Sequence, residues 1–162
     1  MAISFRRFVV LEATAVAAMN AGINALYTWW LWRSRGALPL NGIGGIALDL
    51  ASTPVWIALL STLLGLATIR RKLSSGSVRR PRLQVPHVLR ALPDAIVLRS
   101  IVLGAAAALT LGVPLLLALS ASDAVSLSLA HAVLAKVALT IILSLAIVPI
   151  VIFTVPAEPN GS

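Results

Sequence analysis

The chain of 162 residues contains no cysteine, five acidic residues, two histidines and eight aromatic residues. Without cysteine there are no disulfides, no thiolate metal ligands, no iron–sulfur clusters and no cysteine nucleophiles. Charged residues make up 11% of the chain, whereas an average soluble domain has about 25%. The low charge also excludes an intrinsically disordered chain, which needs high net charge and few apolar residues.

Apolar residues take the place of the missing polar ones. They make up 59% of the chain, and the mean hydropathy is +1.00. A soluble domain is about 45–50% apolar, and a fold of this length could not bury the excess. We therefore predict an integral membrane protein, and the length predicts a single domain over residues 1–162.

Four segments are long and apolar enough to cross a bilayer, which takes about 20 residues. They cover about residues 8–32, 44–69, 96–119 and 129–154. Lipid offers no partner for backbone N–H and C=O groups, so helices are expected, because a helix satisfies its own. The predicted fold class is therefore all-α, an integral membrane bundle of four transmembrane helices.

The basic residues are distributed unevenly between the two sides of the predicted bundle. Ten lie before the first span or in and around the loop 70–95, and two, Arg33 and Arg35, follow the first span. The positive-inside rule places the basic side in the cytoplasm, so both termini are predicted to be cytoplasmic. Eleven Arg against two Lys, with abundant Ala, is typical of a GC-rich bacterial genome. The expected location is therefore a bacterial inner membrane.

The predicted cytoplasmic loop 70–95 carries most of the positive charge. Such a cluster attracts anionic lipid headgroups at about 1 kcal/mol per residue, and a docking site for a protein is the alternative. The loop has no aromatic residue on which bases could stack, so nucleic acid is not an expected partner. The residues predicted to contact headgroups are Arg70, Arg71, Lys72, Arg79, Arg80 and Arg82.

Three ionisable residues, Glu12, Asp49 and Lys136, fall inside the predicted spans. Each costs about 2.5–3.5 kcal/mol on insertion scales, so such residues are candidates for function. At a rise of about 1.5 Å per residue, Asp49 and Lys136 lie at similar depth in the outer half of the bundle, which predicts an ion pair. Glu12 lies near the cytoplasmic face at the level of Arg99. It is expected either to contact Arg99 or to act as a proton-titrating carboxylate.

Polar side chains at helical spacing surround the predicted pair. Asn20 and Asn24 are four residues apart and share one face of the first span. Similar stripes continue from the two charged residues, with Ser52, Thr53 and Trp56 after Asp49, and Thr140 and Ser144 after Lys136. The candidate intramembrane polar site is Asn20, Asn24, Asp49 and Lys136. Two interpretations fit it: helix packing and assembly, or a pathway for a solute or for protons.

Aromatic and small residues form two further patterns. The aromatic residues at the outer end of the first span predict a membrane-interface belt, with a ligand-stacking cluster as the alternative. They are Tyr27, Trp29, Trp30 and Trp32. Small residues at i, i+4 spacing predict close helix contacts, either within the bundle or in a homodimer. They are Ala13, Ala17, Ala21 and Ala25 in the first span, and Gly104 and Ala108 in the third.

The sequence contains no recognisable catalytic or metal-binding motif. His87 and His131 lack paired-ligand spacing, and the glycines at 42, 44 and 45 do not form a nucleotide loop. No metal, cofactor or enzymatic activity is therefore expected. The leading hypothesis is an accessory or assembly subunit of a membrane complex. The alternative is a small homo-oligomeric transporter or channel, and the expected partners are the lipid bilayer and either a second copy or a larger complex.

Overall fold

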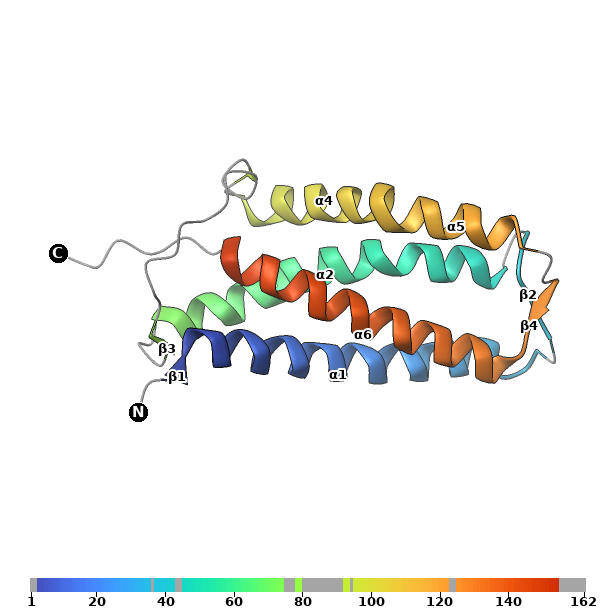
Figure 1. The fold of residues 1–162 in the computed structure, drawn as a ribbon, viewed down its shortest axis with the longest axis horizontal. Coiled ribbons are helices and arrows are strands. Elements are labelled where there is room, and N and C mark those ends of the chain that lie inside the picture. The colour runs from blue at the N-terminus through green and yellow to red at the C-terminus, as the bar shows by residue number, and fades with distance from the viewer. Residues whose placement is uncertain are drawn as a thin grey trace.

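The computed structural model describes residues 3–35, 37–42, 45–74, 78–79, 92–93, 95–122 and 125–154. It contains four long helical rods (Figure 1). They are α1 (Phe5–Trp32), α2 (Ile46–Ser74), the continuous rod of α4 (Ile96–Ala107), π-helix η1 (Ala108–Gly112) and α5 (Val113–Ser120), and α6 (Leu129–Thr154). All four are long and apolar enough to cross a membrane, which confirms the all-α four-helix prediction. The 28 residues of α1 span about 42 Å, close to a bilayer with its headgroup layers.

The first helix begins earlier than predicted. It starts at Phe5 and not near residue 8, so Arg6 and Arg7 lie in its first turn. Ser4 is the N-cap: its hydroxyl oxygen accepts a hydrogen bond from the Arg7 backbone N–H at 3.4 Å. This satisfies one of the N–H groups that have no partner within the helix.

The second helix ends later than predicted. It continues to Ser74, so Arg70, Arg71 and Lys72 are helical and do not belong to a loop that begins at residue 70. A helix can continue beyond the segment that faces lipid, and neither Arg nor Lys is a helix breaker. Most of the remainder of the predicted loop, including residues 80–91, lies outside the described residues.

Two short strand pairs tie the connecting segments together at opposite ends of the bundle. At the end where α1 begins, β1 (Ile3–Ser4) pairs in parallel with β3 (Val78–Arg79). At the other end, β2 (Leu38–Pro39) pairs antiparallel with β4 (Ser126–Leu127). We call these the β1–β3 end and the β2–β4 end. α1 begins and α6 ends at the β1–β3 end (Figure 1), as an even number of crossings requires.

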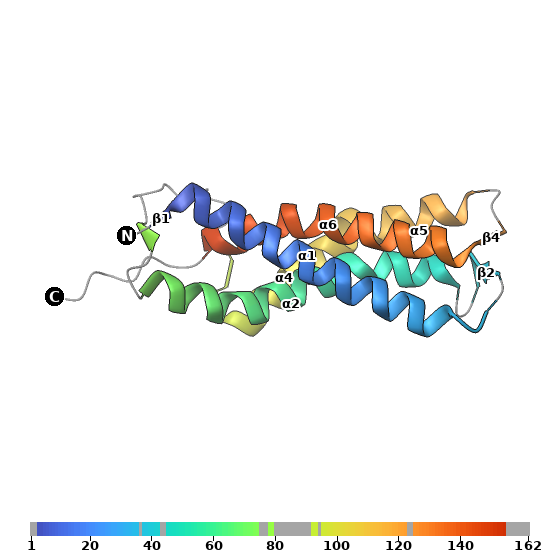
Figure 2. The ribbon, with the colours of Figure 1, turned by 90° about the horizontal axis from the view of Figure 1, so that it is seen from below.

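The four rods do not contact one another equally. α1 packs mainly on α6, whereas the α4–η1–α5 rod packs on α2, and α2 and α6 pack on each other (Figures 1 and 2). Half of the apolar window of α2 is buried, against 17% of that of α1. α2 and α6 are therefore the inner pair, and α1 reaches the rest of the bundle largely through α6.

Two apolar clusters lie at the two ends of the bundle. The cluster near the β1–β3 end joins α1, α2 and α6, and consists of Phe5, Phe8, Ala13, Ile69, Val148, Val151 and Ile152. The cluster near the β2–β4 end consists of Trp32, Leu38, Leu40, Ile46, Ala47, Leu50 and Ala132. Apolar packing thus holds both ends of the bundle.

Small residues make the closest helix contacts, and they do so within the bundle. A Cβ placed on Gly112 would lie 2.7 Å from the backbone oxygen of Ala51, and Gly104 also faces α2. Ala13 and Ala17 on α1 are buried. These small residues therefore serve internal packing. The π turn of η1 directly precedes Pro114, whose missing N–H disrupts regular α-helical bonding.

The contact at Gly112 gives a stability prediction. Gly112→Ala would force α2 and η1 apart, because its Cβ meets backbone rather than a flexible side chain. We expect a loss of about 1–3 kcal/mol in the free energy of unfolding, measured in mild detergent. Gly22→Ala is the matched control, since a Cβ there meets nothing within 4 Å. Equal stability of the two variants would contradict the close contact.

The charge distribution and the position of the helix ends together give a topology prediction. Reporter fusions after residue 154, beyond the end of α6, should be active only as cytoplasmic reporters. Insertions at 123–124, between α5 and α6, should be active only as periplasmic reporters. The reverse pattern would show that the bundle sits in the membrane the other way round.

Candidate functional site

A groove of about 750 Å³ lies between α1 and α2, with α6 as its floor. On α1 its lining runs from Glu12 to Tyr27, and on α2 from Asp49 to Ile69. The 15-residue separation on α1 corresponds to about 22 Å, most of the roughly 30 Å hydrocarbon thickness of a bilayer. The groove is partly open, and side chains at its rims, including Met19 and Trp56, are more than half exposed.

The groove is lined by apolar and polar side chains in nearly equal number. Nine of its nineteen lining residues are polar: Glu12, Asn20, Asn24, Tyr27, Asp49, Ser52, Thr53, Ser61 and Lys136. All four residues of the predicted intramembrane polar site, and Glu12, are among them. The structure thus brings the predicted polar residues of three helices to one groove.

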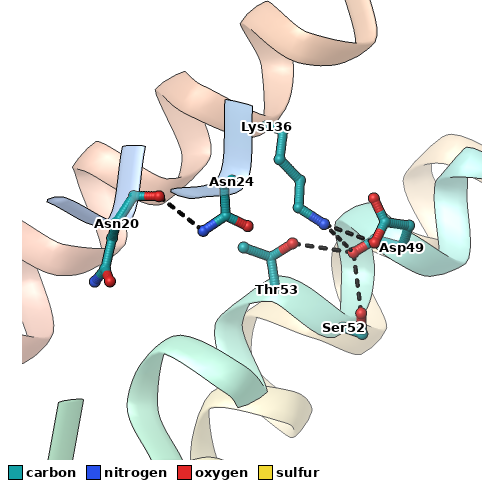
Figure 3. A network of polar contacts seen from close by, with 6 residues as sticks. All are labelled: Asn20, Asn24, Asp49, Ser52, Thr53 and Lys136. Carbon is teal, nitrogen blue, oxygen red and sulfur yellow. Dashed lines mark hydrogen bonds and ion pairs between the residues drawn. The ribbon is translucent and has the colours of Figure 1, made fainter. Parts of the chain in front are cut away.

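The predicted ion pair between Asp49 and Lys136 is present at the β2–β4 half of the groove. Lys136 Nζ lies 2.7 Å from Asp49 Oδ1 and donates to the Asp49 backbone oxygen at 3.1 Å (Figure 3). The Lys136 side chain is 4% exposed and that of Asp49 is 17% exposed. A charge buried this deeply is strongly destabilising without its partner, so the pair fixes α2 against α6.

The start of α2 concentrates hydrogen bonds on Asp49. The hydroxyl groups of Ser52 and Thr53 both donate to the Asp49 backbone oxygen at 3.0 Å. With Lys136, three side-chain donors therefore converge on this one carbonyl (Figure 3). The carboxylate also lies in the first turn of α2, where the positive end of the helix dipole favours a negative charge.

The two asparagines form a separate set of contacts on the α1 wall. Asn24 Nδ2 donates to the Asn20 backbone oxygen at 2.9 Å (Figure 3). Asn20 Nδ2 donates to Ser144 Oγ on α6 at 3.0 Å. Asn20 thus joins α1 to α6, whereas the bond of Asn24 lies within α1. No hydrogen bond joins either asparagine to the Asp49–Lys136 pair within the described residues.

One oxygen of the Asp49 carboxylate lacks a partner. Asp49 Oδ2 is buried and accepts no hydrogen bond within the described part of the chain. Thr140 Oγ1, one turn from Lys136 on α6, is in the same condition. An unsatisfied buried carboxylate oxygen is costly, so a native structure normally supplies a donor for it.

Glu12 pairs with a different residue from the one predicted. Its Oε1 forms an ion pair with Lys72 Nζ near the end of α2. The predicted contact with Arg99 is wrong, because Arg99 lies on α4, which packs mainly against α2. The Arg99 side chain is buried, and its Nε donates to the Pro93 backbone oxygen at 2.8 Å. The Glu12–Lys72 pair joins α1 to α2 at the β1–β3 half of the groove.

The residues predicted to contact headgroups are only partly described. Arg71 and Lys72 are exposed in the last turn of α2, and Arg70 is helical with its side chain outside the description. Arg79 lies in β3, and Arg80 and Arg82 lie outside the described residues. Headgroup contact therefore stays a prediction for all six.

The structure separates the four aromatic residues predicted to form a belt. Tyr27 is 47% exposed and lines the groove, and Lys136 Nζ lies 5.9 Å from the centre of its ring. In the sequence, the spacing of three residues between Tyr27 and Asn24 indicates that the two share one helix face. Trp32 is 5% exposed and belongs to an apolar cluster, not to the predicted belt. Trp29 and Trp30 are exposed, as a belt requires.

A serine–histidine contact lies outside the groove, at the start of α6. Ser128 Oγ lies 2.7 Å from His131 Nδ1 and also accepts from the His131 backbone N–H at 3.3 Å. This is the geometry of a helix N-cap, in which the hydroxyl oxygen serves the first turn. The contact is therefore explained by the local structure of α6.

The chain was compared with protein-family models, with curated proteins and with solved structures, and none of them matches it. Function is therefore argued from the groove and its residues.

The buried ion pair gives a prediction for a double-mutant cycle. Lys136→Met leaves the Asp49 carboxylate unpaired, and Asp49→Asn leaves the ammonium of Lys136 unpaired. Each single change should cost about 3–5 kcal/mol in the free energy of unfolding, measured in mild detergent. The double variant Asp49→Asn/Lys136→Met should cost less than either single change, because no unpaired charge remains. A double variant that loses the sum of the two single effects would contradict a coupled pair.

Proposed function

We propose that this small multi-pass membrane protein binds an amphipathic molecule in the groove between α1 and α2 and carries it through the bilayer. The groove is the observation on which this rests. Its volume of about 750 Å³ lies within the range of small-molecule sites, about 300–1,000 Å³. Its mixed lining suits a guest that has both an apolar and a polar part.

The length of the groove supports transport over binding alone. The groove extends along most of the thickness of the hydrocarbon layer, so a guest could move within it without leaving the protein. Polar residues occur along its whole length, from Tyr27 and Asp49 through Asn20 and Ser61 to Glu12. A polar head group would therefore find partners at each level.

The two ion pairs are contacts between helices that can open and form again. Asp49–Lys136 joins α2 to α6 in one half of the groove, and Glu12–Lys72 joins α1 to α2 in the other. Side-chain ion pairs can exchange partners without loss of the apolar packing at the two ends of the bundle. Opening one pair at a time would admit a guest from one side of the membrane at a time.

An accessory or assembly subunit is the second candidate. The rims of the groove expose Met19, Ile23 and Trp56, and a helix of a partner protein could lie across them. We rank this second because a partner helix would cover the carboxylate-bearing polar lining with apolar surface. Affinity purification in mild detergent, followed by mass spectrometry, separates the two. A stoichiometric partner supports the subunit, and the chain alone or as a homodimer supports the transporter.

The proposal includes a non-enzymatic role and a bacterial inner membrane as the location. The absence of a catalytic motif in the sequence supports the first. The excess of arginine over lysine and the basic residues on one side of the bundle support the second.

Photolabelling in nanodiscs tests binding in the groove. A dodecyl alcohol that carries a diazirine on its chain should label groove residues saturably, and unlabelled dodecanol should compete. Gly65→Leu places a larger side chain in the groove lining and should reduce the saturable labelling about tenfold. Gly22→Leu is the matched control, because Gly22 lies on the exposed face of α1, outside the groove lining, with open space around it.

Saturation separates a site from simple partitioning into the bilayer. Labelling that rises linearly with probe concentration, or that is the same in Gly65→Leu and Gly22→Leu, would overturn the proposed function.

A further inference from the structure

The hydrogen-bond donors around Asp49 are already engaged. Lys136 Nζ is directed to the Asp49 side chain and backbone oxygen. The hydroxyl groups of Ser52 and Thr53 donate to the same backbone oxygen. The protein therefore directs its donors at this end of the groove towards its own acceptors.

Among the described residues that line the groove, the one buried side-chain atom without a partner is an oxygen. Asp49 Oδ2 is buried, and no described residue donates to it. On the α1 wall, Asn20 and Asn24 use their Nδ2 groups for Ser144 and for the Asn20 backbone. Their side-chain oxygens accept none of the hydrogen bonds found within the described residues. The buried Asp49 carboxylate therefore has an unmet need for a donor.

Aromatic side chains line the same half of the groove. Tyr27 and Trp56 lie on opposite walls, and the ring of Tyr27 is 5.9 Å from the ammonium of Lys136. Aromatic faces attract cations through their quadrupole. Donor-seeking oxygens beside aromatic faces are the surroundings that an ammonium group prefers, and they disfavour an anion.

We propose that the guest is a hydrophobic amine whose protonated amino group donates to Asp49 Oδ2, with its alkyl tail directed towards the β1–β3 end. This rests on the proposed function, because it names the chemical class that the groove takes. The tail would lie along Leu60, Val148 and Val151, which line the groove beyond the polar residues near Asp49. A carboxylate head carries no proton to donate to Asp49 Oδ2 and would be repelled by the negative charge of that side chain.

Competition against the diazirine probe tests the head group. The competitors share one twelve-carbon chain: dodecylamine, dodecanol and dodecanoate. Dodecylamine should displace the probe at about tenfold lower concentration than dodecanoate, with dodecanol between them. Because amphiphiles of different charge partition differently into bilayers, each ratio is compared with that of a variant in the same zwitterionic nanodiscs.

The variant is Asp49→Asn/Lys136→Met, which removes the carboxylate without leaving a buried unpaired charge. The ratio of amine to carboxylate potency should fall to about one in this variant. An unchanged ratio would overturn the proposal. If the ratio falls in Glu12→Gln instead, the head group lies at the other end of the groove, and this outcome also overturns the proposal.

The two proposals fail in different ways. If the probe shows no saturable labelling in the wild-type protein, the proposed function fails. If the probe saturates and all three competitors are equally potent, binding in the groove stands and the head-group proposal is overturned.

Discussion

The ammonium group of Lys136 must be neutralised inside the membrane, and Asp49 neutralises it. The two residues are 87 positions apart in the chain and lie on different helices, so their contact fixes how α2 and α6 lie against each other. Breaking such a pair leaves an unpaired buried charge, which costs a large amount of free energy. Any other register between the two helices is therefore strongly disfavoured. With α2 and α6 fixed as the inner pair, α1 packs on α6, and the α4–η1–α5 rod packs on α2.

The groove follows from this arrangement. Since α1 reaches the bundle largely through α6, its face towards α2 is free to line a space, and Asn20 holds that wall in place through its bond to Ser144. On the other side of α2, Gly104 and Gly112 let the third rod approach its backbone closely. Apolar clusters close the bundle at both ends.

Hydropathy and depth were sufficient to predict the four helices and the Asp49–Lys136 pair. Both depend on one coordinate, the distance along the membrane normal, which residue number gives directly. The same reasoning failed for Glu12, because Arg99 lies at a suitable depth but on a helix that packs mainly against α2. Lateral arrangement depends on side-chain packing between helices. That is why the groove, the place of Tyr27 in it and the burial of Trp32 did not follow from the sequence.

A partly open groove between α1 and α2 should admit water within the membrane. The chain has no cysteine, so a single thiol can be placed at Ser61 in the groove, or at the exposed Ile101 of α4, one turn from Gly104, which packs on Leu59. The measurement is the rate at which a small water-soluble maleimide modifies each thiol in nanodiscs. We expect Ser61→Cys to react about tenfold faster than Ile101→Cys, and dodecylamine to slow the reaction at Ser61→Cys. Equal rates at the two positions would mean that no water-accessible groove exists between α1 and α2.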